Sequence, residues 1–89
     1  MGAEGYLNII QASSLDEAIE IYKTHGPVGY YDGYCIGYKE LQFNNQPFVD
    51  VETAKKFVEA NSGGKWSEKG IIVRVDGTDT FVYGVVYPC

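Results

Sequence analysis

The feature that most constrains the fold is the Asp32-Gly33 pair in mid-chain, which has apolar and aromatic residues on both sides. An Asp-Gly pair between two such runs is the strongest short-range signal for a β-hairpin, because its tight turn needs residues that accept positive φ. We therefore predict adjacent antiparallel strands over residues 28–31 and 34–43. Strand alternation then directs Tyr31 away from the core. It assigns four residues to the core face: Tyr30, Tyr34, Ile36 and Tyr38.

Two amphipathic helices are predicted on either side of this hairpin. The first begins after Ser14, and Glu17 three residues later completes the pattern of a capping box. Its core-facing stripe follows helical spacing and consists of Leu15, Ala18, Ile19 and Tyr22. Gly26 should end this helix in the left-handed conformation, followed by the breaker Pro27.

The second helix begins after Asp50 and ends at residues 61–64. Its apolar stripe consists of Val51, Ala54, Phe57 and Val58. Glu52 and Lys56 are expected to pair at i,i+4 spacing on the outer surface.

Three further strands complete the predicted order β-α-β-β-α-β-β. Residues 6–12 are apolar on both faces, which favours a central position in the sheet. Residues 70–75 and 80–87 form a last hairpin around 76–79. Each helix has a single apolar stripe, so we predict one α+β domain over residues 1–89. It would have a single antiparallel sheet with both helices on one face, a ferredoxin-like variant with an added C-terminal strand.

The composition restricts the partners. Twelve acidic and seven basic residues give a net charge of −5, which disfavours direct contact with nucleic acid or membranes and favours a basic protein. No apolar run approaches the ~20 residues that a membrane span needs, and no signal-peptide pattern is visible. Two cysteines are too few for a disulfide framework, so a reduced, cytoplasmic protein is expected.

No set of catalytic, cofactor-binding or metal-binding residues can be assembled from the sequence. His25 is expected to cap the first helix, Cys35 to be buried in a strand and Cys89 to be exposed. These three residues lack the fourth ligand and the close paired spacing of a zinc site. Residues 64–67 lack the glycine that a phosphate loop requires.

The surface of the chain suggests a protein partner instead. A group of acidic side chains on a helix is usually a solvated surface. Here Ile21 lies beside them and would provide an apolar side chain that a partner could bury. Exposed aromatic residues near loops are frequent hot spots. The candidate partner-binding residues are Asp16, Glu17, Glu20, Ile21, Tyr30, Tyr31, Asp32 and Trp66.

In size, charge and lack of catalytic residues the chain resembles phage-encoded inhibitors of bacterial defence, the anti-CRISPR proteins among them. The resemblance implies an inhibitor or adaptor that binds a basic protein, of the kind that handles nucleic acids, in the cytoplasm of the host cell. Residues 9–18 support an alternative, because they are similar to the strand–helix segment of YCII-type dimeric α+β barrels. That resemblance implies a small-molecule-binding, ferredoxin-fold protein that acts as a homodimer.

Overall fold

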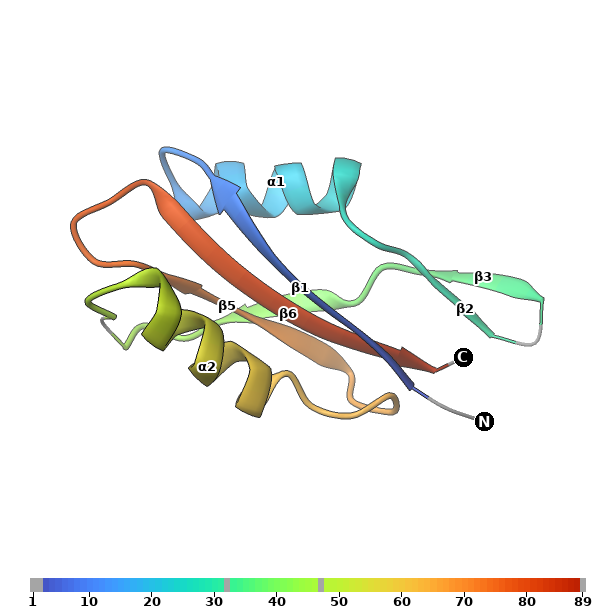
Figure 1. The fold of residues 1–89 in the computed structure, drawn as a ribbon. Coiled ribbons are helices and arrows are strands. Elements are labelled where there is room, and N and C mark those ends of the chain that lie inside the picture. Colours follow the sequence, from blue (N-terminus) through green and yellow to red (C-terminus); the bar gives the residue numbers. More distant parts are fainter. Residues whose placement is uncertain (1–2, 32, 47, 89) are drawn as a thin grey trace.

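The computed structural model describes residues 3–31, 33–46 and 48–88, and its main sheet has four strands (Figure 1). Their order across the sheet is β1 (Ala3–Gln11), β6 (Thr80–Pro88), β5 (Lys69–Arg74) and β4 (Glu40–Phe43). β6 runs antiparallel to both of its neighbours, and β4 runs parallel to β5. Helix α2 (Val51–Asn61) connects these two parallel strands. Helix α1 (Leu15–His25) follows β1 and leads to a separate hairpin of β2 (Gly29–Tyr31) and β3 (Tyr34–Gly37).

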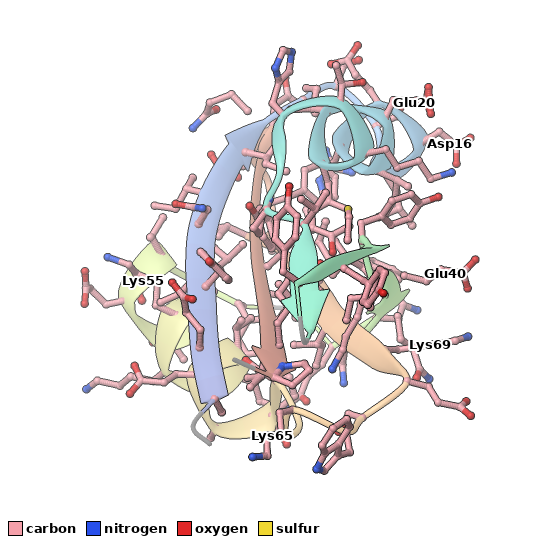
Figure 2. All side chains as sticks on the ribbon, turned by 90° about the vertical axis from the view of Figure 1, so that its right-hand side faces the viewer. Asp16, Glu20, Glu40, Lys55, Lys65 and Lys69 are labelled. Carbon is pink, nitrogen blue, oxygen red and sulfur yellow. The ribbon has the colours of Figure 1, made fainter. Side chains whose placement is uncertain are left out.

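The two helices cover opposite faces of the main sheet. Figure 2 shows α1, in light blue to cyan, and α2, in pale yellow, on either side of the strands. The core on the α1 face contains Ile10, Ala12, Ala18, Tyr22, Ile72, Phe81, Tyr83, Val85 and Tyr87. The core on the α2 face contains Phe48, Ala54, Val58, Val73, Val75 and Val82. The prediction of both helices on one face is wrong, because β6 and β5 are apolar on both faces and each face must be covered.

The sheet also differs from the predicted one in its strand order. The α+β class is confirmed, but the sheet is mixed rather than antiparallel, and the ferredoxin-like order is not confirmed. β1 lies at an edge and pairs with β6, whereas a central position was predicted. β1 has apolar residues on both faces because helices cover both faces of the sheet, and an edge strand also contacts the two cores.

The strand predicted over residues 34–43 divides into β3 and β4, which belong to different sheets. Gly37 lies at the division with a φ of 82°, a left-handed conformation that favours glycine. The chain turns there, so β3 stays with the hairpin and β4 joins the main sheet. The predicted hairpin of residues 70–87 is confirmed as β5 and β6.

Both predicted helices and their N-caps are confirmed. Ser14 Oγ accepts from Glu17 N–H, and Asp50 Oδ1 accepts from Thr53 N–H. Neither helix of the described residues is long and apolar enough to cross a membrane.

Two details of the helix predictions are wrong. Gly26 is extended, with a φ of −78°, rather than left-handed. A Cβ at this position would overlap the Tyr22 carbonyl, so close approach explains the glycine. The Glu52 carboxylate lies 3.8 Å from the Lys55 ammonium, whereas the next residue, Lys56, was the expected partner.

Candidate interaction surface

The β2–β3 hairpin exposes large apolar side chains to solvent. Tyr34 is 75% exposed, Tyr30 58% and Ile36 50%. Together with Val28 and Tyr38, which are also exposed, these residues form what we call the hairpin patch. The prediction that Tyr30, Tyr34, Ile36 and Tyr38 lie on the core face is wrong, because the rings of Tyr6 and Tyr87 already cover the sheet face beneath the hairpin, with their centroids 6.0 Å apart.

Two buried tyrosine hydroxyls hold the hairpin at its base. The Tyr87 hydroxyl donates to the carbonyl of Pro27, before β2, and accepts from Lys39 N–H, after β3. The Tyr22 hydroxyl donates to the carbonyl of Lys39 at 2.6 Å and lies 3.3 Å from the Tyr87 hydroxyl. Burial raises the pKa of Tyr22 well above its ordinary value, so this donor keeps its proton. Both chain segments that enter the hairpin are therefore attached to the main domain.

Gly29 allows the hairpin to approach the sheet. A Cβ on Gly29 would overlap the Tyr87 ring and come within 3.0 Å of Ile36 Cγ1. Only glycine fits there without displacement of the hairpin. The hairpin patch is thus an exposed surface on a positioned element.

Trp66 lies near the base of the same hairpin. The Lys39 ammonium donates to the carbonyl of Lys65 at 3.0 Å and lies 5.6 Å from the centroid of the Tyr87 ring. Burial lowers the pKa of Lys39. Trp66 itself is 67% exposed. Figure 1 shows the loop between α2 and β5 at the same end of the molecule as the hairpin, so both contribute to one end surface.

The acidic residues of α1 lie apart from this surface. Asp16, Glu17 and Glu20 are exposed, and Figure 2 shows Asp16 and Glu20 pointing away from the sheet. They occupy the first half of α1, whereas the hairpin follows its last residue (Figure 1). Glu17 also accepts from Ser13 N–H in the capping box. The structure therefore separates the candidate residues into an acidic helix surface and an aromatic end surface.

The remaining candidates have different outcomes. Ile21 is partly buried against the core on the α1 face, so less of its apolar side chain is accessible to a partner than predicted. Asp32, Cys89 and the side chain of Tyr31 lie outside what the structure describes. Cys35 is exposed, which contradicts its predicted burial, because both faces of the short strand β3 are exposed to solvent.

A cavity of about 400 Å³ opens beside the start of α1, between Leu15, Phe43 and Phe81. Arg74 lines this cavity, but its Nε donates to the carbonyl of Thr78 and its Nη2 lies 3.5 Å from Asp79 Oδ1. The guanidinium is therefore engaged by the β5–β6 turn. Within the described ranges, no group of three or more His, Cys, Asp or Glu side chains could hold a metal ion.

Sequence reasoning missed Val28, Tyr34, Ile36 and Tyr38 as surface residues. Gly37 was the available signal, since a glycine at this point can end a strand and detach a short hairpin from the sheet. Comparison with protein-family models, curated proteins and solved structures finds no match to this chain.

Proposed function

We propose that the protein is a protein-binding module, an inhibitor or adaptor, that holds a basic partner protein through its hairpin patch. The exposure of Tyr30, Tyr34 and Ile36 on a hairpin that is fixed at its base carries this proposal. Aromatic anchors on an ordered element lose little conformational entropy on binding, and they dominate many interfaces. Trp66 at the same end would enlarge the contact area.

Charge supports a basic partner. The net charge of −5 attracts basic proteins, and Asp16 and Glu20 on α1 would guide their approach. Such exposed charges act mainly on the rate of association, whereas buried aromatic contacts act on dissociation. The two separated surfaces would therefore have different roles in one binding event.

The chain's likeness to anti-CRISPR proteins in size and charge suggests which basic protein to expect. We propose a protein that handles nucleic acid in the cytoplasm of a host cell, which the acidic domain would inhibit or recruit. Proteins of this kind present basic surfaces to phosphate backbones, and an acidic domain can compete for such surfaces.

Affinity capture with matched variants tests this proposal. The wild type, the double variant Tyr34→Ser with Ile36→Ser, and the control Val49→Ser would be immobilised and exposed to the same cell extract. Val49 is an apolar residue outside the hairpin and is 85% exposed. We expect the wild type and the control to retain the same basic protein and the double variant to lose it, while all three keep the same circular dichroism spectrum. Equal capture by all three, or capture of acidic proteins only, would contradict the proposal.

The cavity beside Leu15 favours a second candidate function, the binding of a small molecule. Its volume of about 400 Å³ lies within the range of natural ligand pockets. A compound that raises the melting temperature of the wild type in a saturable way, and does so less for Phe43→Ala, would favour this function.

A further inference from the structure

We propose that β1 pairs antiparallel with β1 of a second copy of this chain, so that two four-stranded sheets join into one continuous sheet. β1 is a nine-residue strand at an edge, and no other strand of the described chain pairs with its outer side. Such self-association is independent of the partner protein proposed above.

The register shows which backbone groups face the open edge. Ala12 N–H donates to the carbonyl of Asp79, so residues 12 and 79 form a hydrogen-bonded pair. Such pairs alternate along an antiparallel ladder, so the even-numbered residues of β1 bond to β6. The odd-numbered residues from Ala3 to Gln11 therefore direct their N–H and C=O groups outward.

β1 lacks the features by which edge strands usually avoid pairing. Short length, charged side chains, proline and bulges are the common ones. β4, at the other edge, has four residues and carries Glu40. β1 keeps an uninterrupted register with β6 over nine residues, and its one charged side chain is Glu4, near its start.

Two-fold symmetry then selects a register centred on Leu7. Residues whose backbone groups face the open edge must pair with one another across the two-fold axis. A register centred on Leu7 is the one in which all five odd-numbered residues of β1 find a partner. Leu7 meets the partner's Leu7, and Gly5 meets the partner's Ile9. Five hydrogen-bonded pairs would exchange about ten backbone bonds, the number in a typical interface.

The side chains of β1 are complementary in this register. Ile9 is 44% exposed, and it shares the α2 face with Leu7 and Gly5. The space above Gly5 is open, since a Cβ there would contact only Val86 Cγ2, at 3.9 Å. A cavity of about 260 Å³ lined by Gly5, Leu7 and Val86 adjoins it. Each copy thus provides a projecting Ile9 and a recess at Gly5 that receives the partner's Ile9.

The same register keeps like charges apart. Glu4 lies opposite the partner's Ile10, so the two Glu4 carboxylates are at opposite ends of the seam. Because the two-fold axis is perpendicular to the sheet, both hairpin patches would lie on the same face of the dimer.

Sedimentation velocity over a concentration series tests the proposal with matched variants. Gly5→Val fills the recess, and Ile9→Ala removes the side chain that enters it. We expect the wild type to dimerise and each variant alone to dimerise roughly tenfold or more weakly, because each change affects two symmetric contacts. Val49→Ala, away from β1, should behave as the wild type.

Mixing the two variants gives the sharpest result. In a mixed dimer the introduced valine faces the introduced alanine at one contact, and the native Ile9 faces the native Gly5 at the other. Both contacts are then complementary, so dimerisation should recover. Failure of the folded single variants to form a dimer when mixed would overturn the Leu7 register.

Ile9→Lys, which puts a charge on the edge, tests the seam without any change at Gly5. A dimer that Ile9→Lys leaves intact would overturn the proposal, as would a wild type that stays monomeric up to its solubility limit.

Discussion

Tyr87 is one of the two tyrosines that hold the hairpin at its base, and its hydroxyl contacts both chain segments there. Tyr87→Phe keeps the ring but leaves the Pro27 carbonyl and Lys39 N–H without this partner. We expect the free energy of unfolding to fall by about 1–3 kcal/mol. Amide hydrogen exchange in β2 and β3 should become faster, as measured by mass spectrometry.

Tyr83→Phe is the matched control for this prediction. The Tyr83 hydroxyl accepts from the Asn8 side-chain amide at 3.1 Å and is not bonded to the hairpin. Its loss should destabilise the domain without a selective effect on exchange in β2 and β3. Equal acceleration of hairpin exchange in both variants would contradict the role given to Tyr87.

The thiol of Cys35 reports on the exposure of β3. Because this side chain is exposed in β3, we expect a maleimide reagent to label it rapidly in the native protein. The measurement would use Cys89→Ser, so that one thiol is observed. A native labelling rate far below the rate in denaturant would indicate that a second copy or another segment covers the hairpin.

Among the elements, α2 depends on an ionised N-cap. The Thr53 N–H donates to Asp50 Oδ1 at 2.8 Å, and this bond lowers the pKa of Asp50 below its ordinary value of 3.8. The unfolded chain therefore takes up the proton first, and the stabilisation is complete above the unfolded pKa. We expect it to be lost as the pH falls from about 3.8 through the lower folded pKa. Acid unfolding followed by circular dichroism would measure this loss.

Asp50→Asn isolates this contribution, because asparagine can cap a helix without a charge. The variant should lose less stability than the wild type over the same acidic range. Parallel acid-unfolding curves for the two proteins would contradict the assignment.

The placement of charge over the molecule should control how fast a basic partner binds. Asp16→Lys with Glu20→Lys changes the net charge from −5 to −1, since each reversal adds two positive charges. We expect association with the captured partner to slow by roughly tenfold at low salt and much less at high salt. Surface plasmon resonance at several salt concentrations would measure both rates.

Glu52→Lys with Glu59→Lys makes the same change of net charge on α2, on the opposite side of the sheet. If α1 guides the partner, this control should slow association less. Equal slowing by both pairs would assign the effect to net charge rather than to the α1 surface.

The elements whose signals lie close together along the chain could be predicted from the amino-acid sequence. Both helices, their caps at Ser14 and Asp50, and the β5–β6 hairpin were predictable because capping, helical spacing and strand alternation act between near neighbours. The acidic residues on α1 were likewise predictable as exposed.

The sheet order, the faces that the helices cover and the exposure of the hairpin patch could not be predicted from the sequence. These depend on which distant side chains fill each face first. Tyr22 and Tyr87 come from α1 and β6, yet their hydroxyls together bond to the base of the hairpin, and the Tyr87 ring lies beneath it with Tyr6. Tyr34 and Ile36 follow a core-like alternation, but that face of the sheet was already filled, so they remain exposed to solvent.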